Sequence, residues 1–247
     1  MESLRLALGC LTILPVGPRS TPSDVAFGRS WIWFPLIGLL IGSILVGAHQ
    51  ALARWMPPMA TTALLLGLWV LITGALHLDG LADVCDGLYG GRTPMDRLRI
   101  MKDPHLGTMA VIGVNLQLLL KFTMIHSLAP SALAPSLLLA PCVARYAMVV
   151  LGTTLPYART NGGTAASFVR HATLRSLLIA LTIALTLSWL IARRVGLGLL
   201  GLASAVALLL RALFFRTLGG ITGDALGAAG EIVESVVLCC GVMWLGR

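Results

Sequence analysis

The chain has 247 residues, of which 57% are hydrophobic and only 11% are charged, and its mean hydropathy is +0.90. Because charged residues make up about a quarter of an ordinary soluble domain, this composition excludes that class. The net charge of +8 does not indicate nucleic-acid binding, since the basic residues are scattered and aromatic residues make up only 6%. Basic residues on one side of a membrane, together with anionic substrates, explain the charge better. The five cysteines form neither a disulfide framework nor a zinc pattern.

A membrane-spanning helix needs about 20 mostly apolar residues. The sequence therefore predicts an all-α, polytopic membrane protein with about seven transmembrane helices, in one membrane-embedded domain that covers residues 1–247. The expected spans are about 30–52, 59–76, 108–128, 132–155, 174–192, 195–217 and 231–245. Residues 1–14 carry Glu2 and lack a convincing cleavage site, so we expect a short amphipathic segment at the membrane surface rather than a signal peptide.

The basic residues predict the orientation. With the N-terminus inside, most of the Arg and Lys residues between spans fall on the inner side, although the pair Arg193-Arg194 is a local exception. In this orientation the polar segments 77–107 and 156–173 and the glycine-rich segment 218–230 emerge on the cytoplasmic face, together with all ten acidic residues. We therefore expect the active site at the cytoplasmic face.

The strongest chemical signal is a group of three aspartates. Asp79, Asp83 and Asp86 follow one another at spacings of four and three residues between two apolar segments. In a helix, which advances about 100° per residue, they fall within about 60° of one face. Carboxylates so close repel one another unless a cation or basic groups lie between them. A hard metal ion is the first hypothesis, and a phosphate-bearing substrate is the second.

The rest of this polar segment predicts a second short helix. We expect the second span to continue as one helix through Asp86 and to end at Gly90-Gly91. Thr93-Pro94, with Asp96 in the first turn, is typical of a helix start. The new helix carries Arg97, Arg99 and Lys102 and is expected to end at Asp103, before Pro104. His105, next to Asp103, is a candidate for acid–base chemistry, whereas His77 points away from the aspartate face and is expected to pack.

A second acidic pair and three basic residues complete the candidates. Asp224 and Glu231 share one helical face across the glycine-rich segment, whose glycines allow close backbone approach. Ionisable groups within a bilayer are costly, so Lys121, Arg145 and Arg211 should each face a polar cavity or a partner. One interpretation is a basic wall for a diphosphate. The other, for Arg211 and Lys121, is that the side chain reaches towards the membrane surface.

Four motifs go beyond these patterns. They are His-x-Asp-Gly-Leu-Ala-Asp-x-x-Asp-Gly at 77–87, Ile-Met-Lys-Asp-x-x-x-Gly-Thr at 100–108, Pro-Tyr-Ala-Arg at 156–159 and Gly-Gly-Ile-Thr-Gly-Asp-x-x-Gly-Ala at 219–228. In these four motifs the chain resembles the cobalamin synthase family, whose members are adenosylcobinamide-GDP ribazoletransferases of the cell inner membrane. It departs from the family pattern at His105 and in the Thr-Ile-Leu-Pro stretch at 12–15, which lacks a basic residue before the proline. Neither departure touches the carboxylates.

The resemblance implies a reaction. A ribose hydroxyl of α-ribazole, or of its 5′-phosphate, attacks the phosphorus attached to the cobinamide aminopropanol of adenosylcobinamide-GDP, and GMP leaves. Mg²⁺ is the implied cofactor, and the implied ligands are Asp79, Asp83 and Asp86. Asp103 or Asp224 would be the general base or complete the metal shell.

The other implied partners are membrane lipid and other enzymes of cobalamin assembly, with no nucleic acid and with the oligomeric state left open. The residues expected to bind substrate are Arg97, Lys102, Arg145, Arg159, Gly220, Thr222 and Glu231.

Two other functions compete with this one. A CDP-alcohol phosphatidyltransferase also uses several aspartates on a helix, but its motif needs an Ala-Arg pair that does not follow the aspartates here. A cation-coupled transporter would place its carboxylates near the middle of the bilayer, often within an internal repeat. Here the carboxylates are expected at the membrane edge, which favours the transferase.

Overall fold

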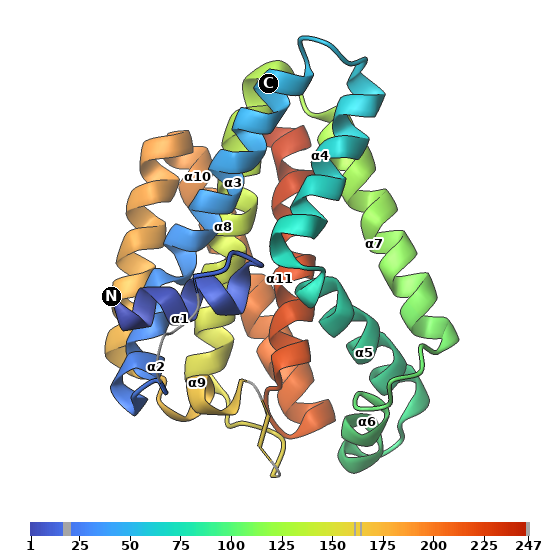
Figure 1. Ribbon diagram of the computed structural model, residues 1–247, viewed down its shortest axis with the longest axis vertical. Coiled ribbons are helices and arrows are strands. Elements are labelled where there is room, and N and C mark those ends of the chain that lie inside the picture. The colour runs from blue at the N-terminus through green and yellow to red at the C-terminus, as the bar shows by residue number, and fades with distance from the viewer. Residues whose placement is uncertain (17–20, 161, 164, 246–247) are drawn as a thin grey trace.

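A computed structural model of the chain describes residues 1–16, 21–160, 162–163 and 165–245, and these residues form an all-helical bundle (Figure 1). The predicted fold class is therefore confirmed. Within the described residues the only β-type pairing is an isolated bridge between Tyr157 and Ile221. In chain order the elements are α1 (Glu2–Leu11), α2 (Asp24–Ser30), the 3₁₀ turn η1 (Trp31–Trp33), α3 (Phe34–Leu52), α4 (Pro58–Thr73), α5 (Leu76–Gly90), α6 (Pro94–Ile100), α7 (Thr108–Ser127), α8 (Pro130–Thr154), α9 (Ala166–Arg170), α10 (Leu174–Leu218), α11 (Gly223–Cys240) and η2 (Gly241–Leu245).

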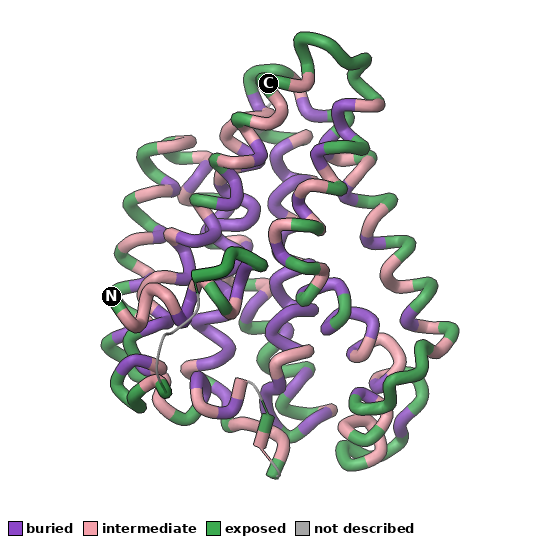
Figure 2. The backbone as a smooth tube through the Cα atoms, viewed as in Figure 1, coloured by how far each residue is buried: buried purple, intermediate pink, exposed green. Residues whose placement is uncertain are grey.

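Five helical stretches among the described residues are long and apolar enough to cross a membrane, or six if the bent pair of α4 and α5 forms one span. Two of them form the centre of the bundle, because 78% of the apolar window of α8 and 72% of that of α11 is buried, compared with 22% for α7. Figure 2 shows the same division, with buried positions along the central helices and exposed ones outside. The last helix begins at Gly223, earlier than expected, so part of the glycine-rich segment is helical.

The second predicted span is not one continuous helix, and that prediction is wrong. The chain breaks after α4, where Gly74 and Ala75 both have positive φ values of 60° and 56°. The axes of α4 and α5 meet at 86°. The end of the N-terminal segment docks on this break, since the Ile13 N–H donates to the Ile72 carbonyl over 2.9 Å. The bend turns α5 across the lower part of the bundle (Figure 1).

A second break lies inside α10. Ala192 and Arg193 leave the helical region, and Arg193 has a φ of 49°. A side chain on Gly196 would meet the Ser188 carbonyl, although eight residues of continuous helix would separate the two positions by about 12 Å. The chain therefore folds back here, and α10 consists of two antiparallel arms (Figure 1). This reversal agrees with the two separate spans expected on either side of Arg193-Arg194.

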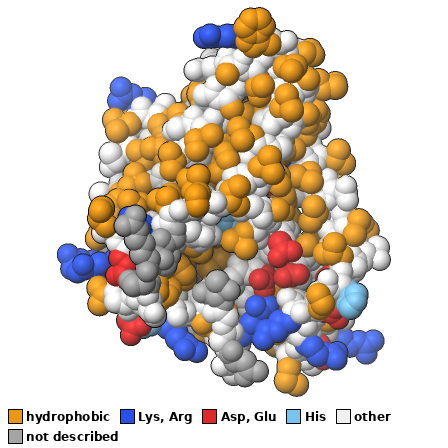
Figure 3. Space-filling model, in the orientation of Figure 1, with side chains coloured by type: hydrophobic (Ala, Val, Ile, Leu, Met, Phe, Trp, Pro, Cys, Tyr) orange, Lys and Arg blue, Asp and Glu red, His pale blue; other side chains and the backbone are white. Residues whose placement is uncertain are grey.

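The polar segments meet at one end of the bundle, as the sequence predicts. The α5–α6 region, the segment after α8 and the start of α11 all lie at the lower end in Figure 1. The face shown in Figure 3 is apolar across its middle, and its acidic side chains gather in the lower part, beside basic ones. This end of the bundle contains the candidate site.

Candidate active site

The site is built where α5 crosses α11. A side chain on Gly80 would meet the Asp224 backbone at 2.6 Å, and one on Gly227 would meet the His77 Cα at 3.0 Å. Only glycine permits such close contact at Gly80, and at Gly227 a side chain would push the two helices slightly apart. The crossing therefore brings the aspartates of the first motif against the first turn of α11.

Three carboxylates converge at this crossing, and we call Asp79, Asp83 and Asp224 the aspartate cluster. Asp83 lies close enough to the other two for their charges to act on it. Asp79 is exposed and Asp83 is half-buried. Neither carboxylate makes a hydrogen bond or an ion pair with any residue that the structure describes. The cluster thus has uncompensated negative charge that faces the lower end of the bundle.

Among the described residues, Arg159 supplies the one ion pair of the cluster. Its guanidinium donates to the Asp224 carboxylate over 2.5 Å and, more weakly, to the Met101 carbonyl over 3.4 Å. Its Nε is buried without a hydrogen-bond partner among the described residues. The guanidinium therefore keeps an unused donor for another group in the site.

Backbone pairing holds Arg159 in place. The Ile221 N–H donates to the Pro156 carbonyl, and the Ala158 N–H donates to the Ile221 carbonyl, both over 2.9 Å. The segments 156–159 and 219–228 are thus joined side by side. Gly220 is buried against the Pro156 backbone. Thr222 is buried as well and caps α11, because its hydroxyl accepts the Ala225 N–H over 3.1 Å.

Asp86 has a partner that the sequence did not suggest. Its two carboxylate oxygens accept the N–H groups of Gly107 and Ala110, over 2.6 and 2.8 Å. These donors belong to the first turn of α7, where backbone N–H groups otherwise lack partners and negative charge is favourable. Asp86 therefore anchors α7 to α5 at the rim of the cluster.

The short basic helix α6 lies below this rim. It starts where the sequence predicts, with a capping box formed by Thr93 and Asp96, although it ends at Ile100 rather than at Asp103. Arg97 is tied to the scaffold, since its guanidinium donates to the carbonyls of Gly91 and Thr217 over 3.1 and 3.0 Å. Lys102 is exposed and makes no ion pair with the described residues, so its charge is available.

Asp103 and His105 form a separate exposed pair. The Asp103 carboxylate accepts the backbone N–H of His105 over 3.0 Å and lies 2.7 Å from its ring Nδ1. These hydrogen bonds lower the pKa of Asp103. The carboxylate therefore stays ionised to a lower pH than usual, and no hydrogen bond or ion pair between described residues joins it to the aspartate cluster.

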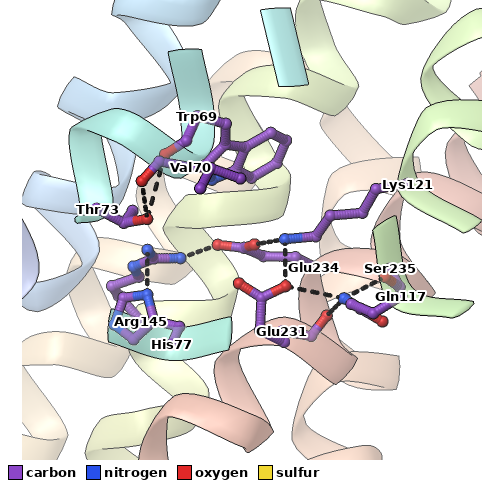
Figure 4. A network of polar contacts seen from close by, with 10 residues as sticks. All are labelled: Trp69, Val70, Thr73, His77, Gln117, Lys121, Arg145, Glu231, Glu234 and Ser235. Atoms are coloured by element: carbon purple, nitrogen blue, oxygen red, sulfur yellow. Dashed lines mark hydrogen bonds and ion pairs between the residues drawn. The ribbon is translucent and has the colours of Figure 1, made fainter. Parts of the chain in front are cut away.

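Arg145 and Glu231 belong to a second charged group inside the bundle, which we call the buried ion network (Figure 4). Lys121 pairs with Glu231 over 2.6 Å and also with Glu234, and Arg145 pairs with Glu234. All four side chains are at most 5% exposed. Arg145, which the sequence predicts to face a polar cavity or a partner, pairs in the structure with a carboxylate of the protein.

Two neutral side chains extend this network. Gln117 donates to the Glu231 carboxylate over 2.9 Å and to the Ser235 hydroxyl over 2.8 Å. His77 is buried, and its Nδ1 lies 3.1 Å from the Arg145 guanidinium. The burial of His77 agrees with the packing or interfacial role expected for it. His77 also connects the network to the aspartate cluster, because it precedes Asp79 by two residues on α5.

The structure therefore divides the predicted site residues. It brings Asp79, Asp83, Asp224 and Arg159 together, with Asp86 at the rim, and it places Arg145 and Glu231 in the buried ion network. Sequence reasoning did not identify Glu234 as the residue that joins Lys121 to Arg145. The available signal was its spacing of three residues from Glu231, which puts both carboxylates on one face of α11.

Arg211 is exposed and donates to the Thr154 carbonyl over 3.4 Å.

The donor chemistry of the cluster suits a hard cation, because carboxylate oxygens are the protein ligands of Mg²⁺. Among the described residues, however, no group of three or more His, Cys, Asp or Glu side chains is arranged to hold a metal by itself. This agrees with the way Mg²⁺ binds in many phosphate-processing sites, through one or two carboxylates plus substrate oxygens. The residues fit a magnesium ion that binds together with a phosphate-bearing ligand.

The fold and the site define a polytopic helical membrane protein with a carboxylate-rich centre at one end of its bundle. The family model described as cobalamin-5-phosphate synthase matches residues 3–242, and the chain belongs to this family. The resemblance expected from the four motifs is confirmed.

Curated relatives carry the name adenosylcobinamide-GDP ribazoletransferase. The protein from Pseudomonas paraeruginosa is 42% identical over 248 residues, which cover 96% of each chain. Those from Chlorobium phaeobacteroides and Stutzerimonas stutzeri are 38% and 39% identical and cover 98% and 100% of each chain. No solved structure matches the chain. Membership of this family sets aside the phosphatidyltransferase and transporter alternatives.

Proposed function

We infer that this chain catalyses the transfer for which its relatives are named, the step of cobalamin biosynthesis that assembles the nucleotide loop. The substrates are adenosylcobinamide-GDP and α-ribazole or its 5′-phosphate. A ribose hydroxyl oxygen forms a new bond to the phosphorus on the aminopropanol, the bond from that phosphorus to GMP breaks, and GMP leaves. The observation that carries this proposal is the uncompensated aspartate cluster beside Arg159, in a chain that matches the family along nearly its whole length.

Asp79 and Asp83 are the proposed ligands of Mg²⁺, because their carboxylates have no other partner among the described residues. Bound there with substrate oxygens, the ion would neutralise diphosphate charge as the phosphorus–oxygen bonds change. The contacts of Asp86 favour a different role for this residue, since both of its oxygens already accept N–H groups from the start of α7. It holds the rim in place and is at most an additional ligand.

Two groups have positions suited to the rest of the reaction. Asp224 is the proposed general base, because it lies within the cluster, whereas Asp103 is ionised, exposed and bound by His105. Arg159, with its unused Nε–H, is the proposed partner of the diphosphate, and the available charge of Lys102 serves the same end. Arg97, Gly220 and Thr222 shape the site through the backbone, and Arg145 and Glu231 support it from the buried ion network.

The bundle is proposed to sit in the cell inner membrane with this end towards the cytoplasm. The support is the excess of basic residues on the inner side in that orientation, together with the gathering of polar segments at one end (Figure 1). Other cobalamin-assembly enzymes would then meet the protein on the same side.

The decisive experiment is GMP release by the full chain in membranes supplied with adenosylcobinamide-GDP, α-ribazole and Mg²⁺. We expect release that depends on the nucleoside, stops when EDTA removes the metal and returns with added Mg²⁺. The variant Asp79→Asn should be inactive, whereas the exposed carboxylate variant Asp24→Asn, far from the cluster, should be active. Absence of nucleoside-dependent GMP release from the wild-type protein would overturn the proposed activity.

A further inference from the structure

An apolar cavity of about 150 Å³ adjoins the aspartate cluster, and none of the roles proposed for the carboxylates and Arg159 uses it. Asp79 and Asp224 line one part of it, and aromatic side chains line another. A cavity of about this volume, lined by apolar side chains, takes up a benzene ring in an engineered protein. The cavity therefore has the size and lining to receive an aromatic group next to the carboxylates.

Its aromatic wall is held in a fixed arrangement. The Trp31 ring lies 4.6 Å from that of Phe34 and 6.2 Å from that of Phe168, measured between centroids. The indole N–H of Trp31 donates to the Phe168 carbonyl over 2.8 Å, so the polar atom of this wall is already satisfied. Met148 and Leu226 also line the cavity. This surface offers apolar contact to a ligand and no further hydrogen bond.

One donor among the lining residues is unused. His77 lines the cavity, and its Nε2 is buried without a hydrogen-bond partner among the described residues. An arginine side chain can only donate, so His77 Nδ1, at 3.1 Å from the Arg145 guanidinium, must accept. The proton of the neutral ring is then on Nε2. A buried donor of this kind is satisfied by a ligand atom with a free lone pair.

We propose that this cavity binds the aromatic base of the nucleoside substrate, with the unprotonated ring nitrogen of the base accepting a hydrogen bond from His77 Nε2. The base of α-ribazole is a dimethylated benzimidazole, which is flat and apolar and carries one such nitrogen. Its ribose would then lie at Asp79 and Asp224, where the hydroxyl attacks. This inference rests on the proposed function, of which it specifies one substrate subsite. A lipid acyl chain would also fill an apolar cavity, but it has no use for the histidine donor.

The first test measures binding of base fragments to the full chain in lipid nanodiscs by calorimetry. We expect 5,6-dimethylbenzimidazole to bind and 5,6-dimethylindole, which replaces the accepting nitrogen by a carbon, to bind about tenfold more weakly. The free base should compete with α-ribazole but not with adenosylcobinamide-GDP. Equal binding of the two fragments, or competition with the corrinoid instead, would overturn the assignment.

The second test fills the cavity. Ala165 lines it, whereas Ala172, at the other end of α9, does not. Ala165→Phe should weaken binding of the base about tenfold and raise KM for α-ribazole without raising KM for adenosylcobinamide-GDP. Ala172→Phe is the matched control and should leave both KM values unchanged. Equal effects of the two variants would contradict the proposal.

A third variant covers the case in which Ala165→Phe disturbs α9. Leu226→Ala enlarges the cavity and should improve binding of a bulkier naphthimidazole base relative to that of dimethylbenzimidazole. Asp79→Asn separates this subsite from the chemistry, since it should abolish GMP release and still bind the free base. If the wild-type protein releases GMP but shows none of these base effects, the subsite is wrong and the activity stands. If it releases no GMP, the proposed function itself fails.

Discussion

The two charged groups of this bundle lie on the same helix but differ in how their charge is compensated. Asp224 of the aspartate cluster and Glu231 of the buried ion network are seven residues apart on α11, about two turns or 10 Å. In the network, the carboxylates of Glu231 and Glu234 are matched by Lys121 and Arg145. In the cluster, three carboxylates face the single guanidinium of Arg159.

This difference separates structure from function. A compensated group within a bundle needs no ligand and holds its helices in one arrangement, although each partner is essential to the other. An uncompensated group of carboxylates is unfavourable until a cation or a cationic ligand joins it. Substitutions in the two groups test this division.

The variant Asp83→Asn removes a charge from the cluster. We expect kcat for GMP release to fall by about 10²–10³-fold, the usual loss when one electrostatic stabiliser of a transition state is removed. The melting temperature should not fall, because the substitution removes a repulsion rather than a favourable contact. Full magnesium-dependent GMP release by this variant would show that the cluster is not the metal site.

The variant Glu234→Gln breaks the buried ion network at the residue that joins its two cations. Breaking a buried ion pair from one side costs about 3–5 kcal/mol, because the remaining charge stays buried. We expect this loss in the free energy of unfolding, measured by denaturation in detergent, with little change of KM in the folded fraction. Glu2→Gln is the control, because the hydrogen bonds of this carboxylate with Ser23 lie at the exposed surface. Unchanged stability together with a raised KM for the corrinoid would instead restore the diphosphate role first expected for Arg145.

The variant Asp86→Ala distinguishes two roles of one carboxylate at the rim. If Asp86 mainly caps α7, the substitution should cost about 1 kcal/mol of stability, as loss of a helix cap does. Its kcat should then fall much less than that of Asp83→Asn. A loss of kcat equal to that of Asp83→Asn, at unchanged stability, would make Asp86 a metal ligand as the sequence predicts.

Local features of this structure were predictable from the sequence. The capping box at Thr93 and Asp96, the end of α5 at Gly90 and the start of α7 at Thr108 each follow from residues within one turn of the boundary. The approximate positions of the apolar spans follow from hydropathy alone. The convergence of the polar segments at one end follows from the alternation of spans and needs no knowledge of packing.

Features that depend on packing were not predictable. The bend of 86° before α5 requires positive φ at Ala75 as well as at Gly74, and nothing in an apolar stretch indicates that an alanine adopts it. The partner of Arg145 lies 89 residues later in the chain. Asp86 likewise finds its donors only because α7 packs beside α5. The aspartate motif predicted two of the three carboxylates of the cluster, and the tertiary contacts add Asp224 and tie Asp86 to the start of α7.

The smallest effect concerns Asp103, which lies outside both groups. Since its pKa is lowered by the hydrogen bonds from His105, the carboxylate remains ionised to a lower pH than that of an ordinary aspartate. It is a weak base, and it lies apart from Asp224. Asp103→Asn should therefore leave kcat/KM nearly unchanged, whereas loss of a general base costs about 10²–10⁴-fold. The acid limb of the pH–rate profile should be the same in this variant as in the wild type and should disappear only in Asp224→Asn. The reverse pattern would move the proton transfer from the crossing of α5 and α11 to the loop before α7.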